Sequence, residues 1–447
     1  MVFARQSYVE KLDRRRGNGL VKIITGIRRC GKSYLLFKLY RRHLEKQGAK
    51  SSQFVEIVLD DERFEDLRDP HKLADYVRRK VKTGPSPHYV FIDEIQYCSA
   101  VPSAADPKVQ VTFYDVLNGL MRLKGVDIYV TGSNSKSLAS DVATNFRGRG
   151  DEVRVHPLTF AEVYGALGGR ESEVWKEYLL YGGLPGAVLK RSAAEKMDYL
   201  SSLYETVYIA DLVERHRLKD DYALGKTVDV VSSAVGSLTN PTRLANALRT
   251  VLKVGCSIPT VKKYLDFLTD AFLFSKVERY NVKGRRYLDY PSKYYAEDIG
   301  LRNARLGWRQ VEPTHLMENV IYNELVVRGV KVDVGVVDND DRSGEKRDRS
   351  PLEIDFVVNA GFEKVYIQSA YSVPDGEKRA QETRPLRKVG DGFRKIVVVG
   401  GMEPRWTDED GITYIGVIDF LLDPSVLERV TSGIVQERKG KGDRRNG

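Results

Sequence analysis

The sequence predicts an α/β protein that begins with a parallel sheet and continues into a helical segment and then a mixed α/β segment. Two observations carry this prediction. An apolar strand at 21–25 runs into a glycine-rich loop and an amphipathic helix, and the run 89–94 is apolar until it ends in two carboxylates. Continuous apolar strands are typical of parallel sheets that are covered on both faces. The expected strands are 21–25, 54–59, 89–93, 126–131 and 151–155.

The loop after the first strand has the spacing GxxxxGKS between a strand and a helix, where this pattern predicts phosphate binding. Glycines let the backbone curl, so that N–H groups and the following helix N-terminus point at an anion. Lys32 can reach the β- and γ-phosphates of ATP, and the Ser33 hydroxyl can complete the shell of Mg²⁺. A plain glycine-rich turn is the alternative, which the flanking elements disfavour. The expected nucleotide contacts are Gly26, Ile27, Arg28, Arg29, Cys30, Gly31, Lys32, Ser33 and Tyr34.

The second half of the expected site is the acid pair Asp93-Glu94 at the end of a buried strand. Ligands of open α/β sheets bind at the carboxyl ends of the strands. We expect Asp93 to hold Mg²⁺ through water and Glu94 to orient and deprotonate the attacking water. Taken alone, the pair could merely open a surface loop, but the phosphate loop upstream favours the catalytic interpretation.

The fourth strand ends in Thr131-Gly132-Ser133-Asn134, which places small polar side chains where a sensor of the γ-phosphate is needed. We expect Asn134 or Ser133, rather than Thr131, to be that sensor. Ser and Asn are also ordinary helix caps, so a capping role is the alternative.

Arginines occupy two further positions of interest. Arg147 and Arg149 precede the fifth strand, and an arginine supplied to the transition state can stabilise phosphoryl transfer. Solvated surface arginines are the equally plain alternative. Arg28 and Arg29, inside the loop, could contact nucleotide, acidic neighbours or neither.

Motifs along nearly the whole chain resemble the prokaryotic AAA+-type ATPases that carry a carboxy-terminal domain of unknown function. This resemblance implies an AAA+ core with an extra strand–helix unit before the acid pair. It also implies assembly into rings, often hexamers, in which an arginine of one subunit completes its neighbour's site. The matching segments, in order, are GIRRCGKS, FIDEIQ, YVTGSNSKSLAS, FRGR, VHPLTFAEV, LLYGGLP (179–185), SIPTVKKYLDFLTDAFLF (257–274), YYAEDIGLRNA (294–304), LMENVIYNEL (316–325), EIDFVV (353–358) and YIQSAYSV (366–373).

Composition predicts an ordinary globular protein of a reducing, cytoplasmic compartment. The chain has 447 residues, 42% hydrophobic and 30% charged, with three scattered cysteines that show no zinc spacing. We find no apolar run long enough to span a membrane and no secretion signal at the N-terminus. The net charge of +10 allows nucleic-acid contact without requiring it.

The segment from about 166 to 310 is predicted to be helical, with a winged helix in its second half. A short helix near 242–248 and a helix at 258–271 capped by Ser257 precede a pair of strands. Lys262 and Lys263 on the second helix could meet DNA phosphates. Winged helices are also common protein-interaction lids, so DNA contact stays one of two alternatives.

The segment from about 311 to 425 is similar to restriction-endonuclease-like nucleases. Glu318 on a helix and Asp355 on a strand match the metal-binding acids of that fold, but Gln368 stands at the next acid's place and Ala370 at the lysine's. Gln is a weak ligand and Ala can neither activate water nor stabilise a leaving phosphate. We therefore expect a decayed nuclease scaffold. Nearby residues that could replace the missing groups are Glu363, Lys364 and Glu382.

We expect a cytoplasmic ATPase with Mg²⁺ and ATP as cofactors, a homo-oligomeric ring, and DNA contact through the winged helix and a basic tail. A slow nucleotide switch that gates a protein partner, of the signalling or toxin–antitoxin type, is one alternative. An active ATP-dependent nuclease is another. The expected domains are 1–165 (AAA+ core), 166–310 (helical lid and winged helix), 311–425 (nuclease-like domain) and 426–447 (disordered basic tail).

Overall fold

The computed structural model describes residues 2–427 with several internal omissions, and it divides the chain into two compact units. One unit comprises residues 1–157 with 270–272, and the other comprises 158–269 with 273–447. Each is described by itself. The positions between 2 and 427 that the structure does not describe are 83, 85, 104, 133–148, 219–221, 340, 344–345, 349, 361–362, 374–375 and 402.

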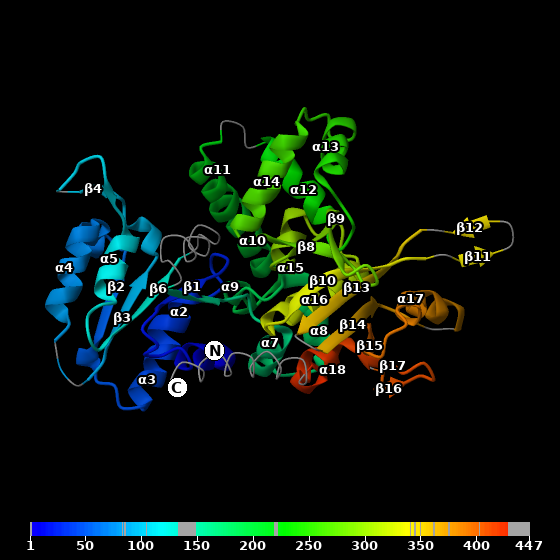
Figure 1. The fold of residues 1–447 in the computed structure, drawn as a ribbon, viewed down its shortest axis with the longest axis horizontal. Helices are drawn as coiled ribbons and strands as arrows, with labels where there is room; N and C mark the ends of the chain where they lie inside the picture. Colours follow the sequence, from blue (N-terminus) through cyan, green and yellow to red (C-terminus); the bar gives the residue numbers. More distant parts are fainter. Residues whose placement is uncertain are drawn as a thin grey trace. The chain divides into compact units, whose positions relative to one another are not determined.

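The first unit is built on a parallel five-stranded sheet in the order β2-β3-β6-β1-β7 (Figure 1). This confirms the parallel α/β core predicted from the sequence. The order places β6 between the strand that leads into the phosphate loop and the strand that ends in the acid pair. The strands are β1 (Val21–Thr25), β2 (Phe54–Val58), β3 (His88–Asp93), β6 (Val126–Thr131) and β7 (Gly150–Arg154).

The two faces of this sheet carry different side chains because strand residues alternate between faces. On one face, Val90, Ile92 and Val130 join an aliphatic core to which α4 (Pro70–Lys80) and α5 (Phe113–Leu120) contribute. On the other face, the ring of Phe91 lies 5.4 Å from that of Tyr129. The sheet is therefore buried on both faces, as the apolar strands predicted.

The remaining elements of the first unit connect these strands. Two short strands, β4 and β5, pair with each other outside the main sheet. The helix after the phosphate loop contains a π-helical stretch, η1. These elements are α1 (Gln6–Asp13), α2 (Lys32–Tyr34), η1 (Leu35–Tyr40), α3 (Arg41–Lys46), η2 (Ser51–Gln53), η3 (Glu62–Arg68), η4 (Ile95–Tyr97), β4 (Val101–Pro102) and β5 (Gln110–Val111).

The second unit begins with helices, as the sequence predicted. The N–H of Thr260 donates to the Ser257 hydroxyl at 3.3 Å, so the predicted cap of the last of these helices is present. Every helix in the described part of the chain is too short or too polar to cross a membrane. The helices are α7 (Phe160–Leu167), α8 (Glu171–Tyr181), α9 (Pro185–Val188), α10 (Ala193–Leu203), η5 (Tyr204–Ile209), α11 (Ala210–His216), α12 (Tyr222–Ser233), α13 (Pro241–Thr250) and α14 (Ile258–Asp270).

The rest of the second unit surrounds an eight-stranded mixed sheet in the order β16-β17-β15-β14-β13-β10-β8-β9. Its strands are β8 (Phe274–Asn281), β9 (Arg286–Ala296), β10 (Lys331–Val337), β13 (Leu352–Ala360), β14 (Glu363–Ala370), β15 (Arg394–Val399), β16 (Trp406–Thr407) and β17 (Ile412–Gly416). The other elements are α15 (Ile299–Arg305), α16 (Pro313–Val327), β11 (Asp341–Ser343), β12 (Lys346–Asp348), α17 (Gly376–Lys388), α18 (Val417–Leu422) and η6 (Pro424–Leu427).

The strand pair expected to form the wing is present as β8 and β9, which pair in antiparallel fashion. However, β8 also pairs in parallel with β10, through Arg279–Asn281 opposite Val334–Val336. The sheet therefore runs through the domain boundary expected near residue 310, a boundary that stays a prediction. Because β10 pairs with the edge of β8 that faces away from β9, the hairpin is part of the larger sheet. It is also the element that follows the helix α14.

Two motifs noted in the sequence meet in the second unit. The carboxylate of Asp298 accepts the N–H of Gly183 at 2.8 Å and the N–H of Leu301 at 3.0 Å. A side chain at Gly182 would overlap this carboxylate, which explains a glycine there. Burial raises the pKa of Asp298 to about 6 although backbone N–H groups favour its ionised form. The segments LLYGGLP and YYAEDIGLRNA are thus structural partners that join α8 to α15.

Candidate active site

The phosphate loop curls as its glycines predict. Gly26 has φ +141°, and a Cβ there would overlap the carbonyl oxygen of Val155. Gly31 also has a positive φ, of +97°, which glycine adopts at little cost. The ammonium of Lys32 donates to the carbonyl oxygens of Gly26 and Ile27 at 3.0 and 3.1 Å. The lysine is therefore folded into the curl of its own loop, with its charge at the place where a phosphate would bind.

Three side chains from three adjacent elements meet beside this loop. The Ser33 hydroxyl donates to Oδ1 of Asp93 at 3.0 Å, and the Thr131 hydroxyl donates to the same oxygen. Thr131 reaches Asp93 because β6 pairs with β3 in the sheet. Burial raises the pKa of Asp93, and the hydrogen bonds from Thr131 and Ser33 oppose that shift. The contact between Ser33 and Asp93 joins the phosphate loop to the acid pair, the two halves of the site that the sequence predicted separately.

Glu94 is held in an unusual backbone conformation. Its φ is +52°, a left-handed value that is strained for a residue with a side chain. Its N–H donates to Oγ1 of Thr131 at 3.0 Å, and Gln96 donates to its carboxylate. The half-buried side chain of Glu94 is therefore positioned by two neighbours, and backbone strain of this kind is concentrated at functional sites.

These residues fit Mg²⁺ and a nucleoside triphosphate. Mg²⁺ prefers oxygen ligands, and the Ser33 hydroxyl and the Asp93 carboxylate already lie together. Lys32 is 4% exposed, so its charge is shielded from water and acts strongly on an anion in the loop. The phosphate loop and the ends of β3 and β6 thus provide a group that can bind the phosphates, groups that can bind the metal ion and an acid that can act on water.

The other residues of the expected nucleotide contact set differ in how they face solvent. Ile27 and Cys30 are fully buried, and the Cys30 thiol donates to the carbonyl oxygen of Val155 at 3.4 Å. Arg28 is half-buried and Arg29 is exposed, while Tyr34 is 45% exposed. Cys30 and Ile27 can therefore meet a nucleotide through their backbone, because their side chains pack inside the unit.

The expected sensor and arginine residues are described only in part. Ser133, Asn134 and Arg147 lie outside the described residues. Arg149 is exposed, and its carbonyl oxygen accepts the N–H of Val21 at 3.1 Å. Val21 begins the strand whose other end leads into the phosphate loop, so Arg149 lies a strand length of about 16 Å from its own loop.

Two features of the site have no motif in the sequence. Thr131 contacts Asp93, a role distinct from that of the expected γ-phosphate sensor, whose residues Ser133 and Asn134 lie outside the described residues. Arg154 pairs with Thr25 in the register of β7 against β1, which places it where the phosphate loop begins. Thr25 itself donates to Oε1 of Glu152 at 2.5 Å. The sequence signal for both residues was their position at the end of a predicted strand. The order of the strands, which brings these ends together, cannot be read from the local sequence.

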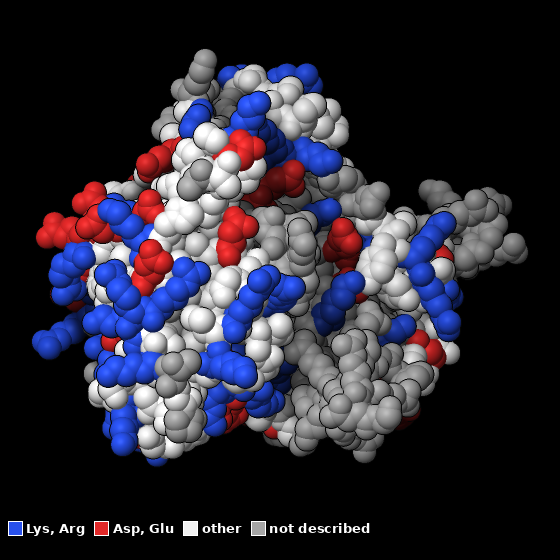
Figure 2. All heavy atoms as spheres, turned by 60° about the vertical axis from the view of Figure 1, so that its left-hand side comes forward, with Lys and Arg blue, Asp and Glu red and all other residues white. Residues whose placement is uncertain are grey.

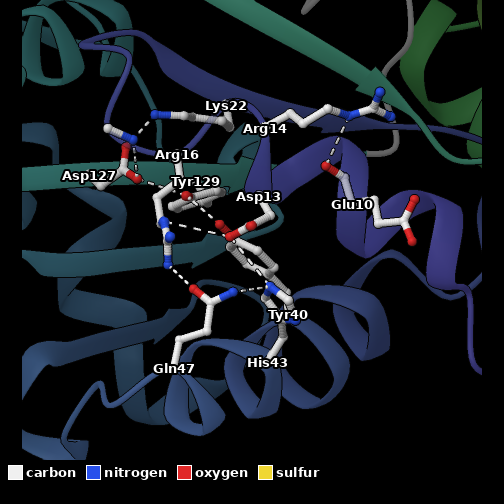
Figure 3. A network of polar contacts seen from close by, with 11 residues as sticks. Glu10, Asp13, Arg14, Arg16, Lys22, Tyr40, His43, Gln47, Asp127 and Tyr129 are labelled. Carbon is white, nitrogen blue, oxygen red and sulfur yellow. Dashed lines mark hydrogen bonds and ion pairs between the residues drawn. The ribbon is translucent and has the colours of Figure 1, made fainter.

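A buried polar network lies at the amino ends of β1 and β6, the opposite end of the strands from the phosphate loop (Figure 3). Lys22 pairs with Asp127, which also accepts from the hydroxyl of Tyr129 at 2.7 Å. The hydroxyls of Tyr129 and Tyr40 lie 2.9 Å apart, and burial raises the pKa of both. Since Tyr40 ends η1, the network ties the helix that follows the phosphate loop to the sheet below it.

Comparison with known proteins agrees with this geometry. Residues 18–164 match the model of the AAA domain, and residues 172–312 match a domain of unknown function, DUF8612. An uncharacterised protein of Haemophilus influenzae is 30% identical over 426 residues, which cover 94% of this chain and 99% of that protein. The chain belongs to the AAA-domain family. A second relative of the family, an uncharacterised protein of Methanocaldococcus jannaschii, is 25% identical over 380 residues, 81% of this chain and 77% of that one.

Two solved structures show more distant likeness to this AAA-domain protein. A Walker-type ATPase of Pyrococcus abyssi has a TM-score of 0.45 and 17% identity, covering 68% of this chain and 96% of that one. The Orc1 protein of Aeropyrum pernix, solved in complex with DNA, has a TM-score of 0.28 and 12% identity, covering 73% and 94%. These scores are too low to support an inference about function.

The second unit of this AAA-domain protein brings together the acids expected of a nuclease-like site. Glu318 on α16 and Asp355 on β13 lie within 2.8 and 3.1 Å of the ammonium of Lys293. Gln368 on β14 accepts the N–H of Asp355 at 3.4 Å, and Ala370 is buried in the core. Within the described part of the chain, no three His, Cys, Asp or Glu side chains are grouped so that they could hold a metal ion.

The residues that could replace the missing nuclease acid or lysine lie at other places. The ammonium of Lys364 lies over aromatic rings, 5.4 Å from that of Phe393, and Glu363 is exposed. Glu382 on α17 is half-buried, and its pKa is raised by burial and by the charge of Asp355. The lysine at the acids is Lys293, which no motif indicated.

Proposed function

We propose that this AAA-domain protein is a Mg²⁺-dependent ATPase. The observation that carries the proposal is the meeting of Ser33, Asp93 and Thr131 beside a loop that contains a buried lysine. A hydroxyl and a carboxylate suit Mg²⁺, and the lysine suits the phosphates. A Gly-rich turn without a nucleotide would not require these groups to converge.

The roles follow from the positions of the side chains. Lys32 binds the β- and γ-phosphates, and Ser33 and Asp93 hold the metal ion that neutralises phosphate charge when bound. Glu94 orients the attacking water and accepts its proton, as a carboxylate positioned by hydrogen bonds can. Thr131 keeps Asp93 and the Glu94 backbone in place.

The test is to compare ATP binding and Mg²⁺-dependent phosphate release in Lys32→Ala and Lys38→Ala. Lys38 is an exposed lysine in η1, so its loss removes a charge near the loop without touching the curl. We expect Lys32→Ala to lose tight ATP binding and Lys38→Ala to retain it. Equal binding by both variants would contradict the assignment of the loop.

We further propose assembly into a ring, with a hexamer as the expected form, in which an arginine acts on the neighbouring subunit's nucleotide. The position of Arg149 supports this. It lies at the far end of β1 from its own loop, so it contacts a nucleotide only if another subunit presents one. A neighbouring subunit that supplies a loop to this edge would place the arginine where it can stabilise the transition state.

A nucleic-acid contact is a second proposal, and the helices α12 to α14 support it. Lys262 and Lys263 are exposed on α14, and the hairpin of β8 and β9 follows, in the order of a winged helix. Basic side chains are scattered across the face drawn in Figure 2, with acidic ones among them. A scattered charge of this kind favours binding to the phosphate backbone rather than to one sequence.

A further inference from the structure

The second unit contains a cation at the centre of its nuclease-like acids. The ammonium of Lys293 lies 2.8 Å from Oε1 of Glu318, 2.8 Å from Oε1 of Glu353 and 3.1 Å from Oδ1 of Asp355. Lys293 comes from β9, Glu318 from α16, and the two remaining acids from β13. One side chain of β9 thus joins the two elements that carry the acids.

Two of these acids each accept a further hydrogen bond. Oε1 of Glu318 also accepts the hydroxyl of Tyr295 at 2.7 Å, and Oδ2 of Asp355 accepts the N–H of Ser369 at 2.9 Å. Both hydrogen bonds hold the carboxylates in the orientation that faces Lys293. The acids are therefore arranged around a cation that the chain itself supplies.

The centre is largely closed, and only Glu353 lies at its edge, with 31% of its side chain exposed. The side chain of Lys293 is 3% exposed and those of Glu318 and Asp355 are each 9% exposed. A Cβ added to Gly236, in the connection between α12 and α13, would lie 3.2 Å from Oε2 of Glu318. The backbone of that connection therefore covers the acid directly. A phosphodiester has no open approach to Glu318 from this side.

A divalent ion and this ammonium compete for the same carboxylate oxygens. An ion placed between Glu318 and Asp355 would meet the positive charge of Lys293 at close range in a buried setting, where repulsion is strong. Moving Lys293 away would leave a buried charge without its partners, which is costly. The acids that match a metal site do not fit a metal ion while Lys293 is present.

We propose that the ammonium of Lys293 takes the place of the divalent ion in this unit, so that Glu318, Asp355 and Glu353 form a metal-free centre. In this account the lysine holds β9, α16 and β13 together and excludes Mg²⁺ and Mn²⁺. The unit then cuts no phosphodiester, and its contribution is made through its surface. The lysine is a structural counter-ion rather than a catalytic residue.

The test measures Mn²⁺ binding to the full chain, without nucleotide, by electron paramagnetic resonance. We expect wild type and Asp355→Asn to bind the same number of Mn²⁺ ions, and Lys293→Met to bind one more per chain. Adding Asp355→Asn to Lys293→Met should remove that extra ion. Lys331→Met, at an exposed lysine on β10, should bind as wild type does.

Two results would overturn the proposal. The first is a wild-type chain that binds one more Mn²⁺ ion than Asp355→Asn does. This result contradicts the proposal even if Lys293→Met fails to fold. The second is a folded Lys293→Met variant, judged by circular dichroism, that gains no ion. Plasmid incubation with Mn²⁺ adds an independent readout, since nicking that disappears in Asp355→Asn would show a working metal centre.

Discussion

Thr131→Val is the substitution that tests the geometry of the nucleotide site most sharply, because it keeps the size and branching of the side chain. The hydroxyl of Thr131, fully buried, donates to Asp93 and accepts the N–H of Glu94. Valine removes both hydrogen bonds and leaves the part-buried N–H of Glu94 without that acceptor, a loss that costs about 1–3 kcal/mol. We expect the free energy of unfolding to fall by about this amount.

The same change should slow ATP turnover, because the hydrogen bond supports the strained backbone of Glu94. If about 1.4–2.8 kcal/mol of that support is lost in the transition state, phosphate release slows roughly 10- to 100-fold. Urea unfolding and steady-state phosphate release measure the two effects. Thr131→Ser keeps the hydroxyl and serves as the control. A Thr131→Val variant as stable and as fast as wild type would refute the role given to this residue.

Three further predictions concern other parts of the molecule. The pKa of Asp298 is raised to about 6 from its ordinary 3.8, so its contribution to stability is complete below pH 3.8 and is lost as the pH rises through 6. In urea unfolding, the free energy of wild type should therefore fall by about 3 kcal/mol relative to that of Asp298→Asn across that window, and parallel pH profiles of the two proteins would contradict this. Arg149→Ala should release phosphate slowly alone but partly recover when mixed with Lys32→Ala subunits, whereas recovery would be absent if the arginine does not act between subunits. Replacing Lys262 and Lys263 by Ala should weaken DNA binding equally for unrelated sequences in fluorescence anisotropy, with a shallower salt dependence; a loss confined to one sequence would instead indicate base recognition.

The fold of the first unit could be predicted from the sequence because each strand carries its own signal. The runs at 21–25 and 89–93 are mostly apolar, and a glycine-rich loop follows one of them. The loop after the first run and the end of the second also predict that Lys32, Ser33 and Asp93 belong to one site. The order of the strands is a long-range property, however. It is this order that puts β6 between β1 and β3 and makes Thr131 a partner of Asp93.

Only the acids at the centre of the second unit could be predicted from the sequence, and the lysine between them could not. Glu318 and Asp355 stand in segments that resemble a known pattern, and the structure brings them together. Lys293 is 25 residues from one and 62 from the other in the chain, on a strand whose sequence gives no reason to expect an acid nearby. The nuclease pattern predicts a lysine at the position of Ala370 because motifs describe fixed spacings. A side chain that arrives from another strand leaves no such spacing.

The most direct measurement of the central claim is phosphate release by Glu94→Gln, with ATP binding measured on the same preparation. Glutamine keeps the shape of the side chain but cannot accept the proton of the attacking water. We predict that binding stays at the wild-type level while hydrolysis slows about 10²–10⁴-fold, the usual weight of a positioned base. Wild type should meanwhile complete many turnovers per binding site, which a nucleotide switch would not. Hydrolysis by Glu94→Gln at the wild-type rate would contradict the account.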